Sequence, residues 1–219
     1  MSLTFAPVDD YLVNVRQMVR KAPNVTTRRA FMRALREWCQ QTQWLRVSLP
    51  GVTTAGKRNY NVGTDLNLDV IGIRAAASSS TASAGVIVAP LTPSDSTIWT
   101  MGSSPGQPRR FCYIPEGQFG LDPVPDSAYN LLITLIVTPR ETAEEVPIEP
   151  LAKYSNDIEA GALAYLLEIP GQAWTDEAAA AVQARRFAAG IANGKTDVQR
   201  AYNTGSMRIR PRPFLMGSR

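Results

Sequence analysis

Residues 24–49, NVTTRRAFMRALREWCQQTQWLRVSL, contain the change from a helical to a β pattern on which the fold class depends. In the first part, side chains that suit one buried face recur at helical spacing: Phe31, Leu35, Trp38 and Thr42. From residue 45 this periodicity is lost, β-branched residues form short clusters, and Ser, Thr, Gly and Pro become frequent. The stretch predicts a helix, with N-cap candidates among residues 24–27, followed directly by a strand.

The same contrast continues on both sides of this boundary. Upstream, residues 12–19 have a helical periodicity that ends at Pro23, which predicts a short first helix. Downstream, residues 75–83 (AAASSSTAS) are too small and polar to pack and are expected to form an exposed loop or strand tip, and Glu116-Gly117 suits a tight hairpin turn. Strands are predicted at residues 46–49, 58–62, 68–75, 84–89, 109–114, 118–121 and 129–138.

Helical periodicity returns after an acidic connector at residues 140–150. The next helix must end before Pro170, because proline cannot continue it. Gly161 lies in its middle, where glycine costs about 1 kcal/mol relative to alanine, so it indicates close approach by another element. One face of this helix is formed by Leu151, Tyr154, Ile158, Ala162, Tyr165 and Leu166.

A final helix is predicted over residues 178–202, with Thr175 as its N-cap and acidic residues in its first turn. Gly190 and Gly194 are expected to bend or interrupt it. Beyond residue 203 the sequence has few core-forming residues and two prolines, so this segment is expected to be extended in isolation.

These patterns define an α+β fold class. It consists of a helical bundle, made of an N-terminal helix pair and two C-terminal helices, with an inserted antiparallel β module and an extended C-terminal arm. The predicted domains are residues 1–44 and 150–202 for the helical bundle, residues 45–149 for the β module and residues 203–219 for the arm.

Composition limits the chemistry that is available. None of the 219 residues is histidine, which excludes Ser-His-Asp and Cys-His catalysis and every metal site that needs imidazole. Cys39 and Cys112 lack CxxC spacing and are interpreted as ordinary buried thiols. Gly194-Lys195-Thr196 resembles the end of a phosphate-binding loop, but Ala189 stands where that loop needs glycine, and a helix precedes it instead of a strand. We therefore expect no catalytic residue, no metal and no cofactor, and a protein that is not an enzyme.

Aspartate pairs are the remaining candidates for chemistry. The candidate carboxylate pairs for acid–base catalysis or calcium binding are Asp65 with Asp69 and Asp122 with Asp126. Neither pair has the further oxygen ligands of an EF-hand loop, and prolines mark the second pair as a turn. A structural role is favoured for both pairs, and a histidine-free hydrolase that uses Asp65 or Asp122 is kept as a third hypothesis.

Charge is distributed unevenly along the chain. The formal net charge is +4, and it equals the four arginines of the last dozen residues. Residues 1–58 hold ten bases and three acids, whereas residues 141–177 hold one base and nine acids. Opposite charges of this kind suit repeated self-association through unlike surfaces, and they equally suit a monomer whose helices neutralise one another. The candidate subunit-interface residues are Arg29, Arg33, Arg36, Glu144, Glu145, Glu149, Asp157 and Glu159.

The basic C-terminal arm favours assembly over a monomer. Residues 207–216, MRIRPRPFLM, combine arginines with apolar side chains in a pattern suited to adding an extended segment to a partner surface. Segments of this kind become ordered on binding. The candidate interface residues of the arm are Met207, Arg208, Ile209, Arg210, Arg212, Phe214, Leu215 and Met216.

Four segments, taken in order, resemble one known family. They are ALREWCQQTQW at 34–44, GQP at 106–108 leading to Phe111, GQFGLDPVPD at 117–126 before Tyr129, and GALAYLLEIPGQAW at 161–174. The ordered set covers about residues 5–200 and resembles the head-to-tail adaptor (connector) proteins of tailed bacteriophages.

The resemblance implies a virion structural protein, assembled in the host cytoplasm and located at the head–tail connector, without membrane contact. Adaptors of this family form a ring, commonly a dodecamer, beneath the portal, where they extend the DNA channel and dock the tail. The implied partners are further copies of the chain, the portal protein, and a tail-side connector, terminator or nozzle protein. Packaged DNA would pass through the channel without sequence-specific binding. The family often places its C-terminal segment against the portal, and residues 203–219 occupy that position here.

The alternative function is a nucleic-acid-binding module that uses the basic N-terminal helices. Such a module would bind duplex DNA with an affinity that falls steeply with salt. On the helix face that carries Arg29, Arg33 and Arg36 no aromatic residue is interleaved, since Phe31 belongs to the opposite stripe, so this face is first interpreted as a solvated surface.

Overall fold

The computed structural model describes residues 3–63, 67–79, 89–94, 104–114 and 117–202. Helices near both ends of this part of the chain flank antiparallel sheets, which confirms the predicted α+β class. The predicted arm and most of the predicted strand at 84–89 lie outside the described residues. In chain order the elements are β1 (Phe5–Pro7), the 3-10 helix η1 (Val8–Tyr11), α1 (Val13–Met18), α2 (Asn24–Thr42), β2 (Arg46–Val52), β3 (Asn59–Asn61), β4 (Leu68–Ser79), β5 (Ala89–Pro90), β6 (Thr92–Pro93), β7 (Arg110–Ile114), β8 (Gln118–Asp122), β9 (Asn130–Pro139), β10 (Glu145–Pro147), α3 (Ile148–Leu167) and α4 (Glu177–Tyr202).

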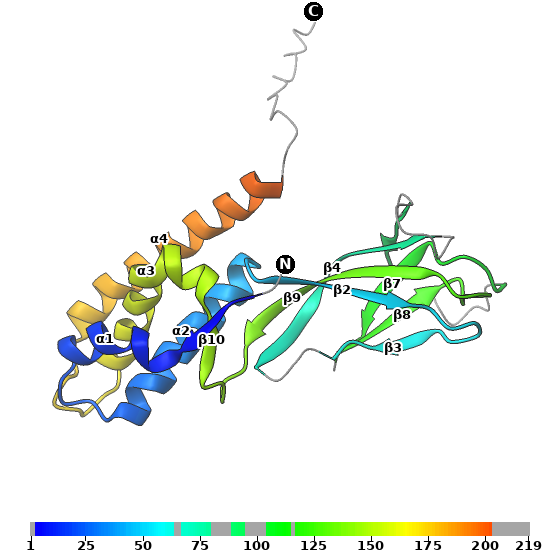
Figure 1. Cartoon of the computed structure of the whole chain (residues 1–219). Helices are drawn as coiled ribbons and strands as arrows, with labels where there is room; N and C mark the ends of the chain where they lie inside the picture. Colours follow the sequence, from blue (N-terminus) through cyan, green and yellow to red (C-terminus); the bar gives the residue numbers. More distant parts are fainter. Residues whose placement is uncertain (1–2, 64–66, 80–88, 95–103, 115–116, 203–219) are drawn as a thin grey trace, which may run out of the picture.

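Helices and long strands occupy opposite ends of the molecule in Figure 1. Helices α1 to α4 gather at one end, and β2, β9 and β4 extend from them towards the other. Strand β9 pairs with β2 on one side and β4 on the other, in the order β2-β9-β4-β5. A second sheet has the order β3-β8-β7-β6, in which β6 and β7 run parallel and the other pairs antiparallel. Strands β1 and β10 pair with each other and tie the N-terminal residues to the segment before α3.

Helix α2 forms where the apolar stripe predicts it, and the whole stripe is buried. The N-cap predicted among residues 24–27 is wrong, because Pro23 occupies that position and no side chain caps the helix. Thr27 instead donates its hydroxyl to the Pro23 carbonyl at 3.1 Å. The helix ends at Gln43, whose φ of 53° places it in the left-handed conformation that terminates helices.

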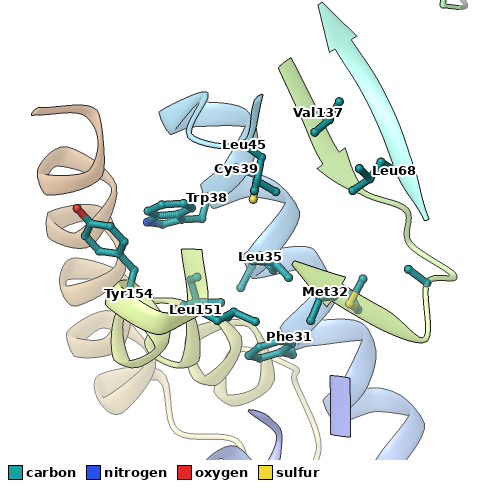
Figure 2. Close-up of a cluster of buried hydrophobic side chains, with 14 of the residues drawn as sticks. Phe31, Met32, Leu35, Trp38, Cys39, Leu45, Leu68, Val137, Leu151 and Tyr154 are labelled. Atoms are coloured by element: carbon teal, nitrogen blue, oxygen red, sulfur yellow. The ribbon is translucent and has the colours of Figure 1, made fainter. Parts of the chain in front are cut away.

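The core connects the helices to the near end of the long sheet through α2. Figure 2 shows Trp38 and Leu35 of α2 facing Tyr154 and Leu151 of α3. The ring centroid of Trp38 lies 4.8 Å from that of Tyr154. Beyond the end of α2, the Leu45 carbonyl accepts a hydrogen bond from the Val137 backbone N–H at 3.1 Å. One continuous apolar cluster therefore includes residues of both the bundle and the sheet.

Glycines allow α4 to approach α2 and α3 closely. A methyl group added at these glycines would lie 2.7 Å from the Phe187 ring at Gly161, 2.4 Å from Asp157 Cβ at Gly190 and 2.8 Å from Thr42 Cγ2 at Gly194. The close approach predicted at Gly161 is confirmed. The bends predicted at Gly190 and Gly194 are wrong, because α4 continues through both positions. Tertiary contact decides the role of these glycines, and their helix propensity does not.

Helix α4 is capped one residue later than predicted. Asp176 Oδ1 accepts a hydrogen bond from the Ala179 backbone N–H at 2.9 Å, which is the N-cap geometry expected of Thr175. The Thr175 hydroxyl instead donates to the Ile169 carbonyl and accepts from the Gln172 backbone N–H. Thr175 thereby holds the turn between α3 and α4.

Residues 75–83 were expected to form an exposed loop or strand tip, and the exposure is wrong at Ala76, Ser78 and Ser79, which are buried. Residues 80–83 lie outside the described residues. Residues 75–79 continue β4 and pair with β9. Ser78 is fully buried, and its hydroxyl donates to the Pro108 carbonyl at 3.3 Å. A strand ladder is built from backbone groups, so small polar side chains do not prevent it. Elements as short as β1, β6 and β10 show no alternation in the sequence and are not predicted from it.

The hairpin predicted around Glu116-Gly117 is confirmed by its strands. Strands β7 and β8 pair antiparallel, with Ile114 opposite Gln118. Gly117 has a φ of 74°, a conformation that favours glycine.

Candidate interaction surfaces

The predicted basic face lies on the outward side of α2. Arg29 and Arg33 are exposed there, and neither forms an ion pair with another described residue. Both line a hollow of about 580 Å³ that is completed by the C-terminal end of α3 and the segment after β9. Glu37 and Glu141 bring carboxylates into the same hollow. A mixed surface of this kind suits a protein partner better than the uniformly negative backbone of DNA.

An aromatic ring orients Arg33. Its guanidinium carbon lies 4.1 Å from the centroid of the Tyr165 ring, in a cation–π arrangement. The Tyr165 hydroxyl donates to Glu37 Oε2. Burial and this carboxylate raise the pKa of Tyr165 to about 12, so the hydroxyl stays protonated and holds the ring in place. A stacked guanidinium keeps N–H donors for a carboxylate acceptor.

Arg36 differs from its two neighbours because it contacts its own chain. Its Nη1 donates to Asp69 Oδ2 at 2.8 Å and to the Pro139 carbonyl at 2.7 Å. Asp69 also accepts from Arg140 Nε at 3.2 Å. Partial burial raises the pKa of Asp69, but hydrogen bonds and charges from both arginines outweigh it, and the pKa lies below its ordinary value. Arg36 thus joins α2 to the start of β4 and the end of β9.

The predicted acidic interface residues before α3 differ in their contacts. Glu144 and Glu145 are exposed, whereas Glu149 is half-buried in the first turn of α3. Glu149 Oε1 accepts a hydrogen bond from the Thr4 backbone N–H at 2.9 Å. Glu149 therefore holds the N-terminal segment against the bundle.

Asp157 and Glu159 lie on opposite sides of α3. Asp157 packs against α4 at Gly190, and both carboxylate oxygens of Glu159 lie 3.3 Å from Asn14 Nδ2 of α1. Burial raises the pKa of both carboxyls, and it outweighs the nearby Arg186 charge at Asp157 and the Asn14 amide at Glu159. These two acids therefore line contacts between helices of the same chain.

The two oppositely charged segments do not neutralise each other through ion pairs. Between described residues, the ion pairs are Arg16–Asp9, Arg36–Asp69, Arg140–Asp69, Arg110–Asp122 and Lys153–Asp197. None of these pairs joins a base before residue 59 to an acid of residues 141–177. The exposed charges of Arg29 and Arg33 in the basic segment, and of Glu144 and Glu145 in the acidic one, are consequently available to partners.

Aspartates considered for catalysis have structural partners where they are described. Asp122 is buried and forms an ion pair with Arg110 of β7. Asp126 accepts a hydrogen bond from the Tyr129 hydroxyl, and this bond lowers the pKa of Asp126. Asp65 lies outside the described residues. Within the described ranges, no group of three or more metal-ligating side chains is assembled.

A second hollow, of about 420 Å³, lies between α2, α3 and α4 and is called the helix groove below. Lys195 at its rim donates to Gln41 Oε1 at 3.1 Å. Gly194-Lys195-Thr196 is therefore part of a continuous helix, with none of the strand-loop-helix geometry of a phosphate loop. Small or apolar residues line the groove: Gly161, Ala164, Ala184, Phe187, Ala188, Ile191 and Ala192. Charged residues at its edge are Glu37, Glu168 and Lys195.

Sequence reasoning missed both hollows. Tyr165 was assigned only to the buried face of α3, although its ring also positions Arg33 at the surface. The mid-helix Gly161 was the one signal for the helix groove, because it indicated close approach by another element. The candidate arm residues 207–216 lie outside the described residues.

No helix in the described ranges combines the length and apolar character needed to cross a membrane. Exposed charges of opposite sign on separate segments, without ion pairs between those segments among the described residues, suit a protein that associates with partners. The chain belongs to the SU10 adaptor protein family, whose profile matches residues 8–210. This is a family of structural phage head–tail adaptors, and it confirms the resemblance found in the sequence. No curated protein matches the chain.

Proposed function

We propose that this chain is the subunit of a ring that lies between the portal and the tail of a phage, where it extends the DNA channel and docks the tail. The observation that carries the proposal is the family match over residues 8–210, nearly the whole chain. The ring is a homo-oligomer, and a dodecamer is its expected size by family resemblance. DNA passes through it without sequence-specific contact.

Surface charge supports self-association in this role. The basic N-terminal residues and the acidic residues 141–177 form no ion pairs with each other in the described structure. Opposite potentials of this kind steer and register neighbouring copies. We propose that Arg29 and Arg33 face acids of a neighbouring copy, with Glu144 and Glu145 as the most exposed candidates.

Each part of the chain has a proposed role. The helical bundle of residues 1–44 and 150–202 forms the ring, and the β module of residues 45–149 meets the tail-side connector, terminator or nozzle protein. Residues 203–219 become ordered on the portal through their arginines and apolar side chains.

The arm assignment is tested by deleting residues 204–219. We expect the shortened chain to unfold at the same denaturant concentration as the full chain but to lose binding to the portal protein in a pull-down. The matched control replaces Arg185 and Arg186, exposed on α4, with alanine and should retain portal binding. Unchanged portal affinity after the deletion would contradict the arm assignment.

The ring is tested by mass measurement of the full chain alone and with portal added. Assembly into a closed oligomer on the portal is expected. Salt-sensitive binding of duplex DNA by the shortened chain, together with no assembly on the portal, would instead support the nucleic-acid-binding alternative.

A further inference from the structure

The tip of the α1–α2 hairpin carries large apolar side chains that no other described residue covers. Met18 ends α1 and Val25 begins the first turn of α2, and they are 69% and 63% exposed. Arg20 and Lys21 are exposed in the turn between them. We call these four residues the hairpin tip. Met18 lies beside the apolar stripe that the sequence places on the first helix, and that stripe, Leu12, Val15 and Val19, is buried.

The helix groove has complementary chemistry. Its walls are small or apolar, and Phe187 and Ile191 contribute to them. Its edge carries the carboxylates of Glu37 and Glu168 against the single cation Lys195. An unbranched methionine fills irregular apolar space well and contacts aromatic rings favourably, and flanking cations suit a rim with excess negative charge.

Helix α1, which leads into the hairpin tip, and the helix groove lie on opposite sides of α3. Glu159 of α3 contacts Asn14 of α1, the helix that ends in Met18. Gly161, two positions further along α3, lines the helix groove. Two residues correspond to a rotation of about 200° around the helix axis, so their side chains point to nearly opposite sides of the helix. One chain therefore cannot place its own tip in its own groove, whereas a second copy can.

We infer that the hairpin tip of one copy inserts into the helix groove of the next copy. The inference rests on the proposed ring and assigns its subunit contact. Two unlike surfaces on opposite sides of a subunit produce a head-to-tail contact, which closes into a ring when the rotation between copies permits. Met18 is the apolar anchor of the contact, and Arg20 and Lys21 lie near Glu168 of the neighbour.

Assembly measurements test the anchor. Met18→Glu should raise the chain concentration needed for half-maximal assembly by at least about tenfold, because it places a charge in an apolar groove. Val52→Glu is the matched control, since Val52 is also a large apolar residue, 61% exposed, and lies on β2 far along the chain. The control should assemble like the unmodified chain, as followed by sedimentation with and without portal.

Charge reversal gives a second test that does not depend on the anchor. Glu168→Lys should weaken assembly by about threefold to tenfold, and the added change Lys21→Glu should restore it. Failure of the second change to restore assembly would overturn the predicted pairing of the tip with Glu168.

Cross-linking identifies what occupies the groove. Cys39 and Cys112 are buried, so new surface thiols can be observed without background. A chain with both Met18→Cys and Ala188→Cys should form a ladder of disulfide-linked oligomers under oxidation, whereas each single change should not. A link formed between Ala188→Cys and Met216→Cys in its place would assign the groove to the C-terminal arm of a neighbour and overturn the inference.

The outcomes separate this contact from the ring itself. If the unmodified chain assembles but Met18→Glu assembles equally well and the double-cysteine chain forms no ladder, the contact is wrong and the ring remains. If the unmodified chain stays monomeric even with portal, both the ring and this contact are wrong.

Discussion

The helical bundle and the long sheet of this protein are stabilised in different ways. In the bundle, α4 approaches its neighbours so closely that a single methyl group at Gly190 would lie 2.4 Å from Asp157 Cβ. In the sheet, β4 and β9 pair along ten residue positions through backbone groups, and Gly51 and Gly72 have no atom within 4 Å of an added methyl group. Changes in side-chain size should therefore alter the stability of the protein when they are made in the bundle. The sheet should tolerate many such changes.

The largest predicted contrast concerns removal of large side chains. Trp38→Ala should lower the free energy of unfolding by about 4 kcal/mol, because it removes a fully buried indole that packs on Tyr154. Leu132→Ala, near the start of β9 where the side chain is 42% exposed, should change it by less than about 0.5 kcal/mol. Urea unfolding of both variants gives the comparison, and similar losses in the two would contradict it.

Adding one methyl group should lower the stability of the protein in the bundle and raise it in the sheet. Gly190→Ala gains about 1 kcal/mol of helix propensity but must displace Asp157, and we expect a net loss of about 1–2 kcal/mol. Gly72→Ala, with open space around it in β4, should stabilise the protein by about 0.5 kcal/mol. The sign of the shift in thermal unfolding temperature distinguishes them, and a stabilising Gly190→Ala would show that α4 can move away from α3.

Asp69 of β4 binds Arg36 of α2 and so connects the sheet to the bundle. The stabilisation from this contact should decrease at acid pH. Its pKa is lowered by Arg36 and Arg140, so its stabilising effect is complete above the unfolded value of about 3.9 and is lost as pH falls through the folded value. Asp69→Asn should cost up to about 1 kcal/mol at pH 7, limited by solvent screening because the side chain is 38% exposed. Unfolding of both chains at pH 7 and pH 3 checks this. A loss of stability as large at pH 3 as at pH 7 would exclude ionisation as its cause.

The smallest predicted effect concerns Glu159 in the bundle, and its dependence on pH is opposite to that of Asp69. Burial raises the pKa of Glu159, so its ionised form costs stability above the folded pKa, and this cost is relieved as pH falls towards the unfolded value of about 4.3. Glu159→Gln should stabilise the protein by a few tenths of a kcal/mol at pH 7, about the size of a surface effect, and by nothing near pH 3. Glu168→Gln, an exposed change at the C-terminal end of α3, is the control and should change the free energy of unfolding by less than about 0.5 kcal/mol.

Prediction from the sequence succeeded where neighbouring residues carried the signal. The stripe from Phe31 to Thr42 located α2, and clusters of β-branched residues among frequent Ser, Thr, Gly and Pro located the ends of β7, β8 and β9 within one residue. It failed at residues 75–79, because small polar side chains conceal a strand that is paired along its backbone. It also failed at Gly190, where low helix propensity indicated a bend although close packing against Asp157 explains the residue.

The candidate surfaces were predicted less completely than the fold. Composition located the basic and acidic segments, but it could not show that Arg29 and Arg33 remain exposed while Arg36 binds Asp69 and the Pro139 carbonyl. Nor could it show that Asp157 and Glu159 face different helices. The partners of these side chains lie 33 to 145 positions away in the chain.

Periodicity and segment order were enough to establish the α+β class and the family, because both depend on residues close together in sequence. Which charges stay available, how α4 uses its glycines, and the placement of the hairpin tip opposite the helix groove depended on the folded chain. Those properties arise when long side chains meet backbone from distant segments. Such contacts cannot be predicted from neighbouring residues in the sequence, and only the packed structure reveals them.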